Sequence, residues 1–249
     1  MSQFFDYSKY YNLLYKDKDY AGEVKYISSL IRRFHKSPKS LLDIGCGTGI
    51  HASMLSNTGL NVHGVDLSNE MLEIAKLKTT PSLSFSQGDV RNFRLGKKFD
   101  VITSLFHVFS YQTSNEAITS SMGTVVEHLD KEGVFIFDCW YGPAVLLDRP
   151  VVRVKRMEDE NIRVLRVSEP VMDFARSTVE VNFEVNVTNK STEQTQVIRE
   201  KHLMRYFFDN ELRLFATNAG LQVLNIYGWL DMSAPKDTSW YITVVCSRK

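Results

Sequence analysis

The chain has 249 residues, of which 43% are hydrophobic and 24% are charged, and its formal net charge at pH 7 is +1. This length is enough for one large domain with a full core. The near-zero charge leaves no basic field that would attract a nucleic acid polymer or an anionic membrane. The N-terminal segment has no signal-peptide pattern, and no apolar run approaches the ~20 residues of a membrane span.

Cysteines and histidines give no sign of a structural bridge or a metal site. Cys46, Cys139 and Cys246 are far apart and odd in number, which is typical of free thiols in a reducing compartment. The six histidines show none of the spacings of a zinc site. We therefore expect a soluble cytoplasmic protein with no bound metal.

The first half of the chain alternates strands with helices. Apolar residues at helical spacing predict a helix over 22–36, which ends before Pro38. The strands expected next are 40–45, 61–66, 83–89, 98–106 and 133–138, and the helices are 48–58, 68–78 (capped by Ser68) and 114–129. This alternation predicts a mostly parallel sheet covered on both faces, with ligands at the carboxyl ends of its strands.

The pattern changes after Pro150. Residues 150–206 are rich in β-branched side chains and alternate apolar with polar, which predicts three or four antiparallel strands. This segment is either an edge extension that finishes the core or a cap over an active site. A helix over 209–219 that ends at Gly220 and strands over 221–229 and 239–247 complete the chain.

A glycine-rich turn joins the first expected strand to its helix in "LLDIGCGTG". Gly45, Gly47 and Gly49 permit positive φ and close backbone approach, so that free N–H groups can point at a ligand. Their spacing is neither the dinucleotide G-x-G-x-x-G nor a lysine-bearing phosphate loop. Asp66 and Asp89 end the next two strands, where one carboxylate can bind ribose hydroxyls and the other an exocyclic amine. A plain strand–helix turn with two capping aspartates is the alternative.

Four segments in order ("LLDIGCGTG", "VHGVDLS", "SQGDVRNF" and "FDVITSLFHVFSY") resemble the class I S-adenosylmethionine-dependent methyltransferases. The resemblance implies an α/β Rossmann-like sheet of seven strands, with the last one antiparallel and a β insertion after the fifth. It implies S-adenosylmethionine as cofactor. The cofactor contacts that it implies are Tyr20, Gly45, Cys46, Gly47, Thr48, Gly49, Asp66, Leu67, Met71, Asp89, Val90 and Leu105.

The sequence patterns predict four parts in the chain. We expect residues 1–39 to form an N-terminal arm and helix that act as a lid, with ordinary packing of the arm as the alternative, and residues 40–149 to form the cofactor-binding core. Residues 150–206 form the antiparallel β insertion on the substrate side. Residues 207–249 supply the helix and strands that complete the core sheet.

A finer resemblance covers most of the chain. "YYNLLYKDKDYAGEV", "FDCWYGP" and "RVLRVSEP" resemble the sugar N-methyltransferases, which dimethylate an amino group on a dTDP-linked deoxysugar. This similarity implies a small-molecule acceptor, a dTDP-sugar, and relatives of this kind often form homodimers. One departure is "SAPKDTSW", which has Lys236 and no arginine, whereas the corresponding segment of those enzymes is rich in glycine and carries an arginine near the diphosphate. Another small amine or a hydroxyl therefore stays open as the acceptor, and so does a non-catalytic cofactor-binding protein.

Several side chains are candidates for the reacting centre. Methyl transfer from a sulfonium needs an aligned, unprotonated amine rather than a strong base. We expect Tyr11, His107 and Tyr111 to serve catalysis, Tyr111 as an orienting group because its reference pKa is ~10. The candidates for substrate binding are Tyr11, Tyr15, Trp140, Tyr141, Arg166 and Ser168. Arginine suits a diphosphate, although Arg166 is also typical of a solvated strand.

Overall fold

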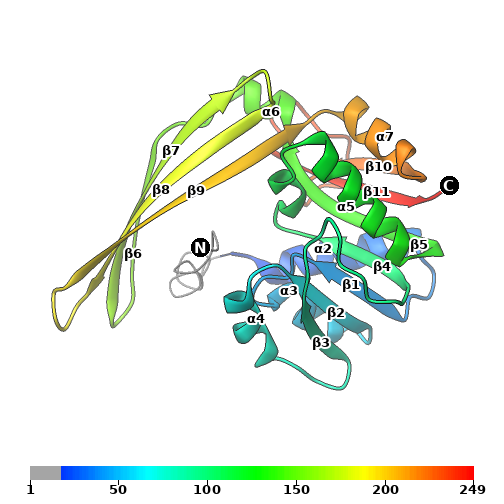
Figure 1. Ribbon diagram of the computed structural model, residues 1–249, viewed down its shortest axis with the longest axis horizontal. Helices are drawn as coiled ribbons and strands as arrows, with labels where there is room; N and C mark the ends of the chain where they lie inside the picture. The colour runs from blue at the N-terminus through cyan, green and yellow to red at the C-terminus, as the bar shows by residue number, and fades with distance from the viewer. Residues whose placement is uncertain (1–17) are drawn as a thin grey trace.

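Seven strands form the core sheet of the computed structural model, which describes residues 18–249 (Figure 1). They are β1 (Ser40–Ile44), β2 (Asn61–Asp66), β3 (Leu83–Gln87), β4 (Phe99–Ser104), β5 (Leu129–Tyr141), β10 (Leu221–Gly228) and β11 (Tyr241–Arg248). Their order is β3-β2-β1-β4-β5-β11-β10, and β11 runs antiparallel to both of its neighbours, β5 and β10, while the other neighbouring pairs are parallel. The expected seven-stranded sheet with an antiparallel last strand is confirmed.

Helices cover both faces of this sheet. They are α2 (Tyr20–Phe34), α3 (Ile50–Ser56), α4 (Asn69–Lys76), η1 (Val108–Tyr111), α5 (Asn115–His128), α6 (Gly142–Leu147) and α7 (Asp209–Asn218). One core cluster joins α5 and α7 to the sheet, and a second joins α2 and α3. Ser68 accepts a hydrogen bond from Met71 N, as expected for its cap of α4. Within residues 18–249 no helix has the length and apolar character that a membrane span requires.

Four antiparallel strands, one short and three long, extend away from the core, and we call them the β arm (Figure 1). They are β6 (Arg153–Glu158), β7 (Ile162–Asp173), β8 (Thr178–Asn189) and β9 (Thr195–Phe207). The end of β9 pairs in parallel with the end of β5, Trp140 with Tyr206 and Tyr141 with Phe207. The β arm therefore continues the core sheet instead of forming a separate one.

The alternating sequence of the β arm gives it two different faces. Cross-strand partners share a face, so Arg166, Val185 and Ile198 lie on the same side. This inner face reaches the core, because Val185 and Ile198 pack with Met71 of α4 in one apolar cluster. The outer face leaves apolar residues such as Val171 exposed to solvent. The β arm is thus held over the carboxyl ends of the core strands.

Candidate active site

A cavity of about 1090 Å³ lies between the carboxyl ends of the core strands and the inner face of the β arm. The turns after β1, β2, β3 and β4 line one half of it, and η1, the end of β5 and the β arm line the other. Pockets for one small ligand are usually about 300–1,000 Å³. The cavity therefore has room for a cofactor together with an acceptor.

The three glycines after β1 serve different purposes, although all have positive φ (71°, 54° and 74°). A Cβ on Gly45 would come within 2.4 Å of Val108, and one on Gly49 within 2.7 Å of Phe85. These two glycines allow close packing. A Cβ on Gly47 would meet no atom within 4 Å, and Gly47 lines the cavity. Gly45 lines the cavity as well, but Gly47 is the glycine whose missing side chain leaves open space there.

Asp66 ties the glycine turn to the start of α4. Its Oδ2 accepts from Gly47 N at 2.7 Å and its Oδ1 accepts from Ser68 N at 2.9 Å. Burial raises the pKa of Asp66, and these backbone N–H groups partly offset that rise. The carboxylate lines the cavity, so it can meet a ribose while it also holds the turn. The sequence did not predict that Asp66 also holds the glycine turn, because this contact depends on β2 lying beside β1 in the sheet.

Asp89, the second predicted carboxylate, is engaged by a neighbour. Arg91 Nε donates to both of its oxygens, at 2.9 and 3.0 Å. The Arg91 hydrogen bonds hold the pKa of Asp89 below its usual value, although burial opposes them. Both residues line the cavity, so a ligand amine at Asp89 would share this carboxylate with Arg91.

The other predicted cofactor contacts fall into two groups. Leu67, Met71, Val90 and Leu105 line the cavity, and Leu67 is 59% exposed there. Cys46, Thr48 and Gly49 lie outside its lining, as does Tyr20. Cys46 and Thr48 are buried, and the Tyr20 ring meets the edge of His51, with centroids 5.1 Å apart.

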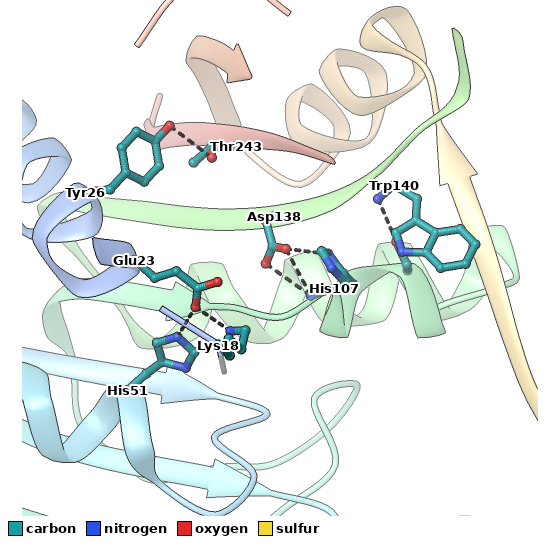
Figure 2. A network of polar contacts seen from close by, with 9 residues as sticks. Lys18, Glu23, Tyr26, His51, His107, Asp138, Trp140 and Thr243 are labelled. Carbon is teal, nitrogen blue, oxygen red and sulfur yellow. Dashed lines mark hydrogen bonds and ion pairs between the residues drawn. The ribbon is translucent and has the colours of Figure 1, made fainter. Parts of the chain in front are cut away.

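A buried network fixes the start of α2 beside the cavity (Figure 2). His51 Nε2 lies 2.7 Å from Glu23 Oε2, and Lys18 pairs with the same carboxylate. Burial raises the pKa of Glu23, but hydrogen bonds from His51 and Lys18 outweigh it and leave the pKa below its usual value. The Lys18 ammonium also lies 4.3 Å from the ring of Phe106, which lines the cavity.

S-adenosylmethionine fits the core half of this cavity. Gly47 leaves open space at a turn, Asp66 places a carboxylate at the end of β2, and Leu67 offers an uncovered apolar side chain to an adenine. A nucleoside requires an anionic group for its ribose hydroxyls and an apolar surface for its base, and Asp66 and Leu67 supply them.

His107 is held firmly at the end of β4. Its backbone has φ 64°, its N donates to Asp138 Oδ1 at 3.1 Å, and its Nδ1 lies 2.5 Å from Asp138 Oδ2 (Figure 2). Its ring stacks on Tyr241, with centroids 4.2 Å apart. Asp138 is fully buried and His107 lines the cavity. These contacts fix the orientation of the His107 ring, which we predict to lie near the acceptor.

Tyr111 connects η1 to the β arm. Its hydroxyl lies 2.7 Å from Nδ1 of His202, whose Nε2 lies 3.2 Å from Glu200 Oε2. Tyr111 and His202 line the cavity. Sequence reasoning missed Glu200 and His202. The available signal was their spacing, because they share the inner face of β9 with Ile198 and Met204, where two polar residues interrupt an apolar face.

The predicted substrate residues gather on the arm side. Trp140, Arg166 and Ser168 line the cavity, whereas Tyr141 packs into the core, and Tyr11 and Tyr15 lie outside the described residues. Arg166 lies over the ring of Phe183, 5.1 Å from its centroid. Arg166 Nε and Trp140 Nε1 are buried and have no hydrogen-bond partner within residues 18–249. Buried donors are rarely left unpaired, so both atoms suit a ligand's acceptor atoms.

Comparison with known proteins agrees with this geometry. Residues 41–133 match the methyltransferase domain family. The chain is 32% identical over 225 residues to the dTDP-3-amino-3,4,6-trideoxy-alpha-D-glucopyranose N,N-dimethyltransferase of Streptomyces venezuelae, covering 90% of this chain and 93% of that protein. It is 28% identical to the dTDP-3-amino-3,6-dideoxy-alpha-D-glucopyranose N,N-dimethyltransferase of Streptomyces fradiae, covering 84% and 80%.

A solved structure extends the similarity to the whole fold. The crystal structure of DesVI from Streptomyces venezuelae superposes with a TM-score of 0.82 at 27% identity, covering 98% of this chain and 99% of that one. The match includes the core sheet and the β arm, since it spans nearly the whole length of both chains. The chain is an S-adenosylmethionine-dependent methyltransferase and belongs to the family that includes the dTDP-aminosugar N,N-dimethyltransferases.

Proposed function

We propose that this enzyme methylates the amino group of a dTDP-linked deoxysugar bound in the arm half of the cavity. The observation that carries the proposal is the pair of buried, unpartnered donors there, Arg166 Nε and Trp140 Nε1. A plain hydrophobic amine would leave both donors unsatisfied. A nucleotide sugar supplies phosphate and hydroxyl oxygens for them. The names of the Streptomyces relatives give the same substrate class.

The charge on the arm side suits a diphosphate. Arg166 lies on β7, and Arg153 lies on β6 opposite Ser168. All three side chains line the cavity. Lys236, the one cation of the segment that corresponds to the arginine-bearing segment of the sugar N-methyltransferases, is not part of the lining. The β arm therefore supplies the cationic contacts that the "SAPKDTSW" segment does not.

Positioning is the main catalytic factor in this proposal. Bound S-adenosylmethionine supplies an electrophilic methyl group on a sulfonium. The chain has to hold a neutral amine in line with that methyl group and to exclude water. Such alignment of the reactants lowers the activation barrier by ~7–11 kcal/mol, so no strong base is needed. Gly47 and Asp66 would hold the cofactor, while Arg166 and Trp140 would hold the nucleotide and sugar. Tyr111 and His107 would orient the amine.

A methylation assay tests the proposal. The enzyme is incubated with S-adenosylmethionine and dTDP-3-amino- or dTDP-4-amino-deoxysugars, and products are separated and weighed by mass spectrometry. We expect the mass gain of one or two methyl groups on an aminosugar and none on dTDP-glucose, whose sugar carries hydroxyls and no amino group. Methylation of dTDP-glucose, or cofactor binding with no transfer to any aminosugar, would contradict the proposal. The latter result would favour another small amine.

A further inference from the structure

We infer that Glu200 and His202 are positioning residues that fix the direction of the Tyr111 hydroxyl and receive the proton released by methylation. The inference rests on the proposed function, because it needs an amine at Tyr111. The three side chains form one chain of contacts, 2.7 Å from Tyr111 Oη to His202 Nδ1 and 3.2 Å from His202 Nε2 to Glu200 Oε2. The first contact joins η1 to the β arm, so the row of three side chains depends on how the arm packs against the core.

Glu200 fixes the tautomer of His202. An ionised carboxylate only accepts hydrogen bonds, so Nε2 carries the hydrogen of a neutral imidazole. Nδ1 is then the acceptor, and Tyr111 O–H donates to it. Both partners are nearly buried, with 5% side-chain exposure for His202 and 7% for Glu200. Solvent is therefore a weak competitor for these contacts.

The surroundings of His202 hold the ring in place. Phe183 of β8 meets the imidazole edge to face, with centroids 5.0 Å apart. Cross-strand pairing places Phe183 opposite Glu200 and Val181 opposite His202. Tyr111 adds a third ring, 5.8 Å from the imidazole. A ring fixed by packing holds its hydrogen-bond direction with little loss of conformational entropy on binding.

This direction matters for an amine nucleophile. The lone pair of the nitrogen must point at the methyl group, so its N–H groups must be taken by acceptors. A tyrosine hydroxyl can donate or accept. Because Tyr111 O–H donates to His202, its oxygen faces the amine as an acceptor. A donating hydroxyl would instead bind the lone pair and block the attack.

The same contacts give the proton a destination. The amine lone pair forms the new N–C bond as the S–C bond breaks and its electrons stay on sulfur. The product nitrogen is then a cation with an N–H. That proton passes to Tyr111 Oη while the Tyr111 hydroxyl proton passes to His202 Nδ1. His202 becomes an imidazolium beside Glu200, and the amine is neutral and ready for a second methyl group.

Four variants test the inference: Tyr111→Phe, His202→Leu, His202→Asn and Glu200→Gln. Rates of the first and second methylation are measured, with thermal melting and S-adenosylhomocysteine affinity as checks on folding. We expect His202→Leu to lower kcat by ~100-fold, the low end for general acid–base groups, with cofactor affinity unchanged. His202→Asn presents an oxygen near the Nδ1 position, so it should restore the first methylation but release monomethylated product. Glu200→Gln should slow the second methylation more than the first.

The combined variant Tyr111→Phe/His202→Leu separates this role from general packing. Residues that act as one unit give non-additive losses, so the double variant should lose no more than the worse single variant. The inference would be overturned if the fold-loss of the double variant equalled the product of the two single fold-losses. Wild-type rates of both methylations in His202→Leu would overturn it as well. Failure of the proposed function would show differently, as no aminosugar methylation by the wild-type enzyme.

A spectroscopic measurement tests the tautomer without any turnover. The ¹⁵N shifts of the His202 imidazole, assigned by comparison with His202→Asn, report which nitrogen carries hydrogen. We expect hydrogen on Nε2 and none on Nδ1 at neutral pH, with this preference weakened in Glu200→Gln. Hydrogen on Nδ1 in the wild-type protein would overturn the inference, because Tyr111 would then accept from His202.

Discussion

The core sheet and the β arm contribute opposite kinds of surface to one cavity. The core contributes backbone turns, with Gly47 leaving space and Asp66 tying the turn together. The β arm contributes side chains on extended strands, among them Arg166 and His202. The glycine turn has both to pack against the core and to leave space for a ligand, so it tolerates few substitutions. On a strand, one inward-facing residue can be substituted without moving its neighbours. The cavity thus combines a part built from backbone turns with a part built from separate side chains.

Burial separates the two regions as well. Core strands such as β4 are covered on both faces, and Ile102 and Thr103 have no exposed surface. The β arm is a single layer with an outer face that leaves Val171 61% exposed. Changes to the core should therefore alter stability and cofactor binding, while changes to the polar residues on the inner face of the arm should alter acceptor binding or methylation and leave cofactor affinity unchanged.

The largest effect is expected at the glycine turn. Gly47→Val places a branched side chain in the cavity at a left-handed position, so affinity for S-adenosylhomocysteine should fall by at least ~100-fold, about 3 kcal/mol, in calorimetry. Gly96→Val is the matched control, since Gly96 also has positive φ and open space, at a turn outside the large cavity. Equal losses in both variants would mean that strain, not lost space, explains the effect.

A second prediction concerns the pH dependence of core stability. Burial raises the pKa of Asp43 to about 6 from an ordinary 3.8, although His51 and a hydrogen bond from Thr103 oppose it. Between these values the folded protein holds a proton that the unfolded chain has lost, so stability falls as pH rises from about 4 to 6.

Asp43→Asn removes this titration. Relative to the wild-type protein, we expect it to gain about 2–3 kcal/mol of unfolding free energy on going from pH 4 to pH 7, measured by urea unfolding without ligand. A difference between the two proteins that does not change with pH would show that Asp43 ionises at its ordinary pKa.

Asp66→Ala tests the carboxylate that we expect both to hold the glycine turn and to bind the cofactor. Losing the acceptor for Gly47 N and Ser68 N should weaken cofactor binding by ~1–3 kcal/mol. Asp66→Asn keeps one acceptor oxygen and should lose less. Calorimetric affinities for S-adenosylhomocysteine that match the wild-type value in both variants would remove Asp66 from the site.

The core was predictable because its signals are local. The glycines and Asp66 stand at strand ends, and parallel strands bring their carboxyl ends to one edge of the sheet. The strand over 61–66 was predicted with the bounds that the structure gives it. Two short helices were missed: α6 and η1 are too short, at 6 and 4 residues, to show a period.

The acceptor side was harder to predict because its contacts are long-range. Tyr111 and His202 are 91 residues apart, and only the return of β9 to β5 brings them together. Likewise, the sequence predicts Gly45 and Gly49 as ligand contacts but not the packing that also requires them, against Val108 and Phe85; Gly45 lines the cavity and Gly49 does not. The segment 150–206 was read as either an edge extension or a cap, and the β arm both continues the sheet and lines the cavity.

The division of the cavity between core and arm is tested most directly by two-ligand calorimetry. Affinities for S-adenosylhomocysteine, and for dTDP in its presence, are measured for the wild-type enzyme, Arg166→Met and Arg163→Met, whose side chain lies on the outer face of β7. We predict that Arg166→Met loses at least ~10-fold in dTDP affinity, about 1.4 kcal/mol, and keeps its cofactor affinity, while Arg163→Met changes neither. No dTDP binding by the wild-type enzyme, or a parallel loss of both ligands in Arg166→Met, would contradict the account.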